Sequence, residues 1–382
     1  MLPRPWWFLV VLVAVVAGGC ARVKPLALQR GVTSEKDPWI FGEEIAPPVD
    51  DPDEIVFAAV GDMGAPGIVQ ASVAKGVEKA CADRCDFVLL LGDNLYWEGV
   101  EDRGDEATLG CLVGQYPTKR KYLVLGNHDY IPTRPNLKRA RNQLSWIRKQ
   151  AESRNGVGAS GRYHFYRFQA GPVKLVALDT NILVRGRVNS TYAELARWLG
   201  PLRSSPDDWV IVFGHHAYVS NGEHGDAGTY LEGGFKLWPA TFLQHFFTQH
   251  VVGRAHLIIA GHDHNLQFFS RTRGYNTAQI VSGSGAKCNP RGDRADDRAD
   301  MERYGYGFAI VEARRGRLTV TFHDYAGRRF WGAYRTPDDP EWRPLDGVPK
   351  ISVDTTDRCP REYSRMMRES RGAGLRVCRG GS

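Results

Sequence analysis

The chain has 382 residues, of which 42% are hydrophobic and 24% are charged, and its formal net charge is +7. These fractions are those of a soluble globular protein, and the length is enough to bury a sizeable core. A positive excess attracts anionic small molecules, nucleic acid or an anionic membrane. No run of lysine and arginine favours nucleic acid, so we expect no nucleic-acid partner.

The first twenty residues differ from the rest of the chain. Arg4 precedes an apolar run from Leu9 to Ala17, which is followed by two glycines and Cys20. A positive start, a short apolar run and a small-residue exit are typical of a secretory signal peptide, and the run is shorter than the ~20 residues of a spanning helix. The ending resembles a bacterial lipobox, although Ala17 stands where leucine is usual. We expect a signal peptide over residues 1–20. Lipidation of Cys20, ordinary cleavage and an uncleaved anchor stay open.

Each of these alternatives exports the domain, to the periplasm, to the outer membrane as a lipoprotein, or into the medium. Membrane attachment through a lipidated Cys20 is therefore one expectation. An even number of further cysteines, in an oxidising compartment, predicts disulfides. A pair between Cys359 and Cys378 would anchor the C-terminal tail. The Cys81-x-x-x-Cys85 spacing could instead bind a metal, but no histidine lies near it.

Three further segments follow the signal peptide. Residues 21–53 are rich in proline and acidic residues and predict a linker. A globular domain is expected over residues 54–336. Residues 337–382 are rich in proline, arginine and glycine and predict a surface extension.

Within the globular domain, five fully apolar runs predict strands that are buried on both faces: 55–60, 87–91, 122–125, 209–213 and 256–260. Helical patterns lie between them and further strands follow. The expected helices are 67–82, 138–150, 191–203 and 237–250, and the later strands are 277–282, 307–313 and 317–325. Alternation of strands and helices favours an α/β fold with two central sheets covered by helices.

Each of the five apolar runs ends in glycine followed by a polar residue. Glycine allows a sharp turn and a close approach to a ligand, and sites in α/β sheets gather at the carboxyl ends of strands. All the polar residues are of types that bind metal ions, and mixed imidazole and carboxylate sites suit zinc, iron or manganese. The residues are Asp62, Asp93, Asn127, His215 and His262, joined by His264. This set predicts a metal centre.

The same blocks resemble those of calcineurin-like metallophosphoesterases, over residues 55 to 325. The blocks are Gly61-Asp62-Met63-Gly64, Gly92-Asp93-Asn94-Leu95-Tyr96, Gly126-Asn127-His128-Asp129, Gly214-His215 and Gly261-His262-Asp263-His264. Most members of that superfamily have histidine where this chain has Gly64. Tyr96 three residues after Asp93 resembles instead the purple acid phosphatases, and the stretch from Gly92 to Val100 is most similar to the small tartrate-resistant subgroup. The resemblance implies a four-layer α/β/β/α sandwich with two mixed sheets.

The resemblance also implies a dinuclear centre with a shared carboxylate. The first ion, ferric iron, would take Asp62, Asp93, Tyr96 and His264. The second, which could be iron, zinc or manganese, would take Asp93, Asn127, His215 and His262. Asp93 would bridge the two ions. A hard ferric ion favours carboxylate and phenolate oxygen, and a phenolate needs the metal because free tyrosine has a pKa near ~10.

Two ions about 3.5–4 Å apart can activate water, orient a phosphate ester and neutralise the transition state. The implied reaction is hydrolysis of a phosphate monoester by metal-bound hydroxide, with no phospho-enzyme. The leaving group needs a proton, for which His128 and His224 are the candidates, since free histidine has a pKa near ~6.5. Asp129 is expected to orient His128. His216 is expected to point away from the centre.

Two alternatives stay open. A phosphodiesterase or nucleotidase would use the same metals with a different surrounding pocket. A non-catalytic exported metal-binding protein would keep the cluster but would not need His128 and His224. We expect an acid phosphatase that acts as a monomer on small phosphate esters.

Overall fold

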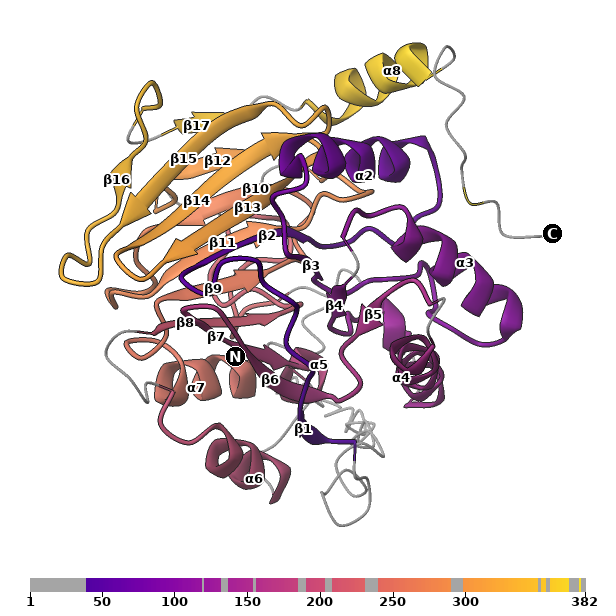
Figure 1. Cartoon of the computed structure of the whole chain (residues 1–382), viewed down its shortest axis with the longest axis horizontal. Coiled ribbons are helices and arrows are strands. Elements are labelled where there is room, and N and C mark those ends of the chain that lie inside the picture. The colour runs from indigo at the N-terminus through magenta and orange to yellow at the C-terminus, as the bar shows by residue number, and fades with distance from the viewer. Residues whose placement is uncertain are drawn as a thin grey trace, which may run out of the picture.

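Two stacked β-sheets form the centre of the protein, with helices on their outer sides (Figure 1). The computed structural model describes residues 39–118, 120–131, 137–153, 156–184, 190–202, 208–230, 240–289, 298–349, 352–354, 358–370 and 378. The predicted signal peptide and Cys20 lie outside these residues. The arrangement is the predicted four-layer α/β/β/α sandwich.

The first sheet has eight strands and is mixed. β2, β3, β4 and β5 run parallel to one another, whereas β13 pairs antiparallel with both β2 and β14. The carboxyl ends of β2, β3 and β4 therefore meet at one edge. In spatial order the strands are β16 (Arg343–Pro344), β15 (Arg329–Arg335), β14 (Arg317–Asp324), β13 (Gly307–Arg314), β2 (Glu54–Val60), β3 (Phe87–Leu90), β4 (Lys121–Leu123) and β5 (Ala159–Ser160).

The second sheet has nine strands and is mixed as well. β7, β8, β9 and β11 are parallel, while β6 and β10 pair antiparallel with their neighbours β7 and β11. In spatial order the strands are β1 (Phe41–Glu43), β6 (Phe165–Ala170), β7 (Val173–Leu178), β8 (Trp209–Gly214), β9 (Leu257–Ala260), β11 (Ala278–Ser282), β10 (Leu266–Phe269), β12 (Met301–Arg303) and β17 (Ser352–Asp354).

Helices cover the outer faces of both sheets. In Figure 1, α2, α3 and α4 lie beside the eight-stranded sheet, and α6 and α7 lie beside the nine-stranded one. Their bounds are α2 (Ile68–Cys81), α3 (Arg103–Gly114), α4 (Leu137–Glu152), α5 (Thr180–Val184), α6 (Ser190–Leu199), α7 (Thr241–His250) and α8 (Cys359–Ser370). The four predicted helices correspond to α2, α4, α6 and α7. Among the helices that the structure describes, none is long and apolar enough to cross a bilayer.

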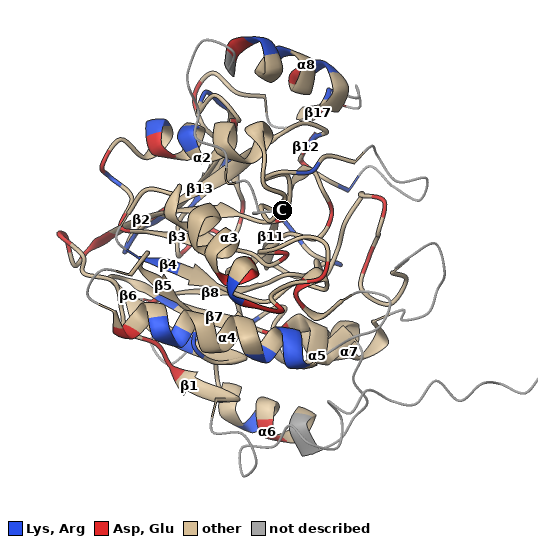
Figure 2. Cartoon of the chain, turned by 90° about the vertical axis from the view of Figure 1, so that its right-hand side faces the viewer, with Lys and Arg blue, Asp and Glu red and all other residues tan. Residues whose placement is uncertain are grey.

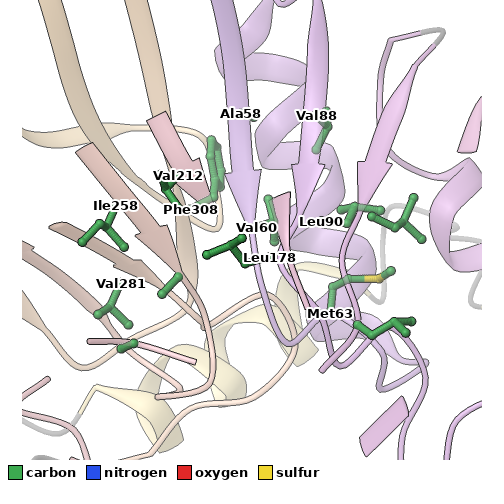
Figure 3. Close-up of a cluster of buried hydrophobic side chains, with 14 of the residues drawn as sticks. Ala58, Val60, Met63, Val88, Leu90, Leu178, Val212, Ile258, Val281 and Phe308 are labelled. Atoms are coloured by element: carbon green, nitrogen blue, oxygen red, sulfur yellow. The ribbon is translucent and has the colours of Figure 1, made fainter. Parts of the chain in front are cut away.

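Burial on both faces explains the fully apolar strands. In β2, Ile55, Phe57 and Ala59 pack into the layer between the sheets. The alternate residues Ala58 and Val60 pack in a second cluster with helix residues. Figure 3 shows part of this second cluster, with side chains from both sheets. Strand side chains alternate between the two faces of a sheet. A strand that is buried on both faces therefore has no solvent-exposed position for a polar side chain.

The described chain contains three disulfides, one local and two between distant segments. They join Cys81 to Cys85, Cys111 to Cys378, and Cys288 to Cys359. The expected pair of Cys359 with Cys378 is therefore wrong, because each tail cysteine is bonded to the domain and not to the other. The Cys81–Cys85 bond likewise excludes a metal site there. Disulfides of this number are typical of an extracytoplasmic protein.

Both ends of the described chain pack against the sheets. β1 lies inside the predicted linker and pairs with β6. In the predicted extension, β17 pairs with β12, and α8 contacts α2. Positive and negative side chains are interspersed over the described elements, with both signs on α8 (Figure 2).

Candidate metal centre

Tight turns after five strands bring polar side chains together at the edge where the carboxyl ends of strands from both sheets meet. Three of these residues have a left-handed backbone, with φ of 59° at Asp62, 52° at Asp93 and 71° at His262. Such angles are uncommon outside glycine and mark sites where the surroundings impose the conformation. The loops are joined directly: the backbone N–H of Asp62 donates to the Gly92 carbonyl at 3.1 Å, and that of His262 to Asp62 Oδ2 at 2.8 Å.

Glycines in these turns leave room for the carboxylates. A Cβ at Gly126 would lie 2.1 Å from Asp93 Oδ1, and one at Gly261 would lie 2.6 Å from Asp62 Oδ2. Both distances are far below van der Waals contact. The glycine–polar pairs in the sequence therefore have a steric reason, because each glycine lets a neighbouring loop pass close to a buried carboxylate.

One group of buried donor atoms comes from Asp62, Asp93 and His264, whose ligand atoms all lie within 4.8 Å of one another. The Tyr96 hydroxyl joins them, at 3.1 Å from Asp62 Oδ1 and 3.2 Å from His264 Nε2. His264 Nε2 is itself 3.4 Å from Asp62 Oδ1. Carboxylate, phenol and imidazole thus converge on one point.

Gly64 explains why Tyr96 can reach that point. A Cβ at Gly64 would lie 2.5 Å from the backbone of Asp93, Asn94 and Leu95. The backbone N–H of Gly64 donates to the Asp93 carbonyl at 3.0 Å, and that of Tyr96 to the Gly64 carbonyl, also at 3.0 Å. No side chain fits at position 64 while the two loops stay this close, so the loop after Asp93 supplies the extra oxygen donor instead.

A second group of donors surrounds His215. Its Nε2 lies 2.9 Å from Asn127 Oδ1, 3.4 Å from Asp93 Oδ1 and 3.3 Å from His262 Nδ1. Its Nδ1 lies 2.8 Å from the Leu91 carbonyl. Since a carbonyl only accepts, Nδ1 carries the proton and Nε2 presents a lone pair to the centre. This orientation by a backbone carbonyl is typical of metal-binding histidines.

The electrostatics of the centre suit cations. Burial alone raises the pKa of Asp93, but the His215 and His128 imidazoles hold it well below its usual range. Burial lowers the pKa of His262 far below its usual value, helped by the neighbouring histidines, which keeps the ring neutral. Burial, Asp62 and Asp93 raise the pKa of Tyr96 well above its usual value. A phenolate forms here only if a cation displaces the proton.

The donor types of the centre also fit bound ions. Two buried groups of possible ligands lie here, Asp62, Asp93 and His264 in one and His215, His216 and His262 in the other. Carboxylate and imidazole donors together suit zinc, iron or manganese. Two buried groups of histidine and aspartate thus form a site suited to two metal ions.

The two predicted acid histidines lie on either side of these donors. The His128 ring lies 4.5 Å from the Tyr96 ring, and its Nδ1 is 2.8 Å from the Trp97 carbonyl. The His224 ring stacks on the His262 ring at 4.3 Å between centroids. All nine predicted site residues are therefore gathered in one region.

Two expectations about neighbouring residues are wrong. The Asp129 carboxylate does not orient the His128 ring, whose nitrogens face the Trp97 carbonyl and Asp93. It accepts instead from the backbone N–H groups of Gly126 at 2.8 Å and Asn94 at 3.1 Å. It therefore holds two ligand loops together. His216 does not point away, because its ring centroid lies 4.5 Å from that of His262, and its Nδ1 is 2.7 Å from Thr180 Oγ1.

Sequence reasoning missed three further residues at the centre. His216 belongs to the same group of donors as His215 and His262. Asp263 accepts from the His224 backbone N–H at 2.8 Å and so holds that loop. Lys287 places its ammonium 4.1 Å from the centre of the Tyr96 ring. Of these three residues, only His216 had a signal in the sequence, its position next to His215. The alternation of side chains in a strand predicted the wrong direction for it, because residue 216 lies beyond the end of β8.

Comparison with known proteins agrees with this geometry. Residues 55–266, more than half of the chain, match the family described as calcineurin-like phosphoesterase. The chain is 28% identical over 318 residues to purple acid phosphatase 4 of Arabidopsis thaliana, covering 76% of this chain and 87% of that protein. It is 28% identical over 309 residues to tartrate-resistant acid phosphatase type 5 of Homo sapiens, covering 71% and 88%.

Solved structures show the same fold. The purple acid phosphatase PPD1 of yellow lupin (Lupinus luteus) superposes with a TM-score of 0.54 at 15% identity, covering 76% of this chain and 55% of that one. PhoD gives a TM-score of 0.51 at 13% identity, covering 87% and 80%. The chain belongs to the calcineurin-like phosphoesterase family, as a distant relative of the purple acid phosphatases.

Proposed function

We propose that this protein is an exported acid phosphatase of the purple type, which hydrolyses phosphate monoesters at a dinuclear metal centre. The observation that carries the proposal is the Tyr96 hydroxyl, 3.1 Å from Asp62 Oδ1 and 3.2 Å from His264 Nε2. A tyrosine among carboxylate and imidazole donors favours a ferric ion, because a hard trivalent cation prefers anionic oxygen. The distant relationship to purple acid phosphatases supports the same assignment.

In this proposal Asp62, Asp93, Tyr96 and His264 would hold ferric iron. Asp93, Asn127, His215 and His262 would hold the second ion, which would be iron, zinc or manganese. Asp93 would serve both ions, since it belongs to the first group of donors and its Oδ1 lies 3.4 Å from His215 Nε2. Bound cations would activate a water, orient the phosphate and neutralise charge in the transition state. No side chain needs to act as the nucleophile.

The chain's own contribution to the reaction is the transfer of a proton. His128 Nδ1 donates to the Trp97 carbonyl at 2.8 Å, which fixes the ring. The opposite atom, Nε2, lies 3.9 Å from Asp93 Oδ2 and so faces the centre. When protonated, it can donate to the leaving oxygen of the ester. We assign the same role to His224, whose ring stacks on His262.

Export follows from the first twenty residues. We propose that residues 1–20 are a signal peptide that exports the protein. Lipidation of Cys20 would attach it to a bacterial outer membrane. Ordinary cleavage would release it to the periplasm or the medium instead. Disulfides are compatible with each of these compartments. Mass spectrometry of the mature N-terminus separates the two outcomes, because lipidation adds acyl chains to Cys20.

The proposed reaction is tested with two chromogenic substrates, p-nitrophenyl phosphate and its diester, on purified protein of known metal content. The proposal predicts metal-dependent release of nitrophenol that is faster from the monoester, and its loss on chelation. Faster turnover of the diester would favour a phosphodiesterase. Two bound ions per chain without hydrolysis of either ester would show a non-catalytic metal-binding protein.

A further inference from the structure

Lys287 lies beside the metal centre in an unusual environment. Its ammonium is 3.7 Å from the centre of the Trp97 ring and 4.1 Å from that of the Tyr96 ring. The side chain is half-buried, while Trp97 is 65% exposed, so this is the side on which solvent reaches the centre. A cation above two aromatic faces is attracted by the ring quadrupoles, which are negative over the faces.

The loop that carries Lys287 is fixed at the two residues that follow it. The backbone N–H of Asn289 donates to the His264 carbonyl at 3.0 Å. The disulfide between Cys288 and Cys359 ties the loop to the start of α8. The backbone from which Lys287 reaches the Tyr96 and Trp97 rings is therefore fixed by the fold.

Lys287 has no hydrogen bond and no ion pair in the described part of the chain. Two other lysines with restricted exposure have hydrogen-bond acceptors: the buried Lys121 donates to the Val157 carbonyl at 3.0 Å, and the half-buried Lys174 to the Leu202 carbonyl at 3.2 Å. Removing an ammonium from water without a hydrogen-bond partner is unfavourable. Burial lowers the pKa of Lys287, and the Asp93 and Asp62 carboxylates oppose this shift only through space. The ammonium therefore has room for an anionic oxygen that it can bind directly.

We propose that Lys287 binds the phosphate group of the substrate and makes the site selective for monoesters over diesters. This inference rests on the proposed function of the same site. A monoester carries about 1.5 to 2 negative charges near pH 7, whereas a diester carries only about one. A fixed cation beside the centre therefore attracts the monoester more strongly. The second ester group of a diester would also have to pass Lys287 and Trp97.

Substitution of Lys287 separates this role from a structural one. In Lys287→Met the aliphatic stem stays and the charge is lost, whereas Lys287→Arg keeps the charge. We expect Lys287→Met to lower kcat/KM for p-nitrophenyl phosphate about 10- to 100-fold at pH 7, mainly through KM, as for loss of a hydrogen bond to a charged group. The diester should change about threefold or less, and Lys287→Arg should retain most of the selectivity. Lys75→Met, an exposed lysine on α2, is the matched control.

The outcomes distinguish this inference from the proposed function. If the monoester is hydrolysed but Lys287→Met leaves the ratio of kcat/KM for the two esters unchanged, Lys287 is not the selective residue. If the unaltered protein hydrolyses neither ester, the proposed function fails, and calorimetric binding of inorganic phosphate becomes the test. Weaker phosphate binding in Lys287→Met would then support Lys287 as an anion-binding residue, and equal binding would overturn it. Matching thermal unfolding midpoints show that each variant is folded.

Discussion

The Tyr96 hydroxyl and Asp62 Oδ1 lie 3.1 Å apart, although they come from different strand ends. The contact depends on Gly64, where any side chain would collide with the backbone that follows Asp93. Gly64 in the first block and Tyr96 in the second therefore depend on each other. Because position 64 has no side chain, the loop after Asp93 can pass close by and place the phenol oxygen of Tyr96 beside Asp62.

Substitution of Gly64 should therefore disturb the centre. Gly64→Ala places a Cβ 2.5 Å from backbone atoms that cannot rotate away, and such overpacking costs about 1–3 kcal/mol. We expect a lower unfolding midpoint and fewer metal ions per chain. Gly67→Ala is the matched control, because a Cβ there meets nothing within 4 Å. Equal metal content in the two variants would show that position 64 has no part in shaping the site.

Substitution of the two proposed proton donors, His128 and His224, should affect turnover without affecting metal binding. We expect His128→Ala and His224→Ala to keep their metal and lose about 10²- to 10⁴-fold in kcat, as for loss of a general acid. His245→Ala, on the exposed side of α7, is the control. Metal analysis and turnover of p-nitrophenyl phosphate are measured on the same samples. Unchanged turnover in both variants would refute the assignment of the acid.

The choice between Asn127 and His216 as ligand can be decided by metal counting. Asn127 Oδ1 lies 2.9 Å from His215 Nε2, whereas His216 contacts Thr180 through Nδ1. We expect Asn127→Ala to lose the second ion and His216→Ala to keep both. Loss of an ion from His216→Ala alone would make His216 the ligand and Asn127 a neighbour.

The local parts of the fold could be predicted from sequence, and the long-range parts could not. Apolar runs such as Phe87–Leu90 are strands because both faces are buried, a pattern visible within a few residues. α3 was missed because only Leu109, Leu112 and Val113 are buried in it, and its start depends on Asp102 accepting from two backbone N–H groups. These features carry too little periodic signal for a helix prediction.

Within the site, the candidate ligands could be predicted because they follow the ends of apolar strands. The other residues of the site lie in loops and could not be predicted in this way. Asp129, Asp263 and Lys287 act through contacts with residues far away in sequence, as in the bond from the His224 backbone to Asp263. The predicted disulfide pairing was wrong for the same reason, since Cys378 pairs with Cys111, which is 267 residues away in the sequence. Spacing along the chain contains no information about such pairs.

His323 should make the fold sensitive to acid. Burial lowers the pKa of His323 to about 4, below the usual ~6.5 that an unfolded chain would show. The unfolded state therefore binds the proton first as the pH falls, and stability decreases between pH 6.5 and 4. The loss is about 3 kcal/mol from pH 7.5 to pH 4. Urea unfolding at both pH values should show a smaller loss in His323→Gln; an equal loss would place the acid-sensitive group elsewhere.

The account depends most directly on a tyrosinate bound to ferric iron at the end of β3. Metal analysis combined with a visible spectrum tests this on the purified protein. We predict two ions per chain, at least one of them iron, and an absorption band in the visible that Tyr96→Phe abolishes. A colourless protein that hydrolyses phosphate esters with two zinc or manganese ions would contradict the iron assignment.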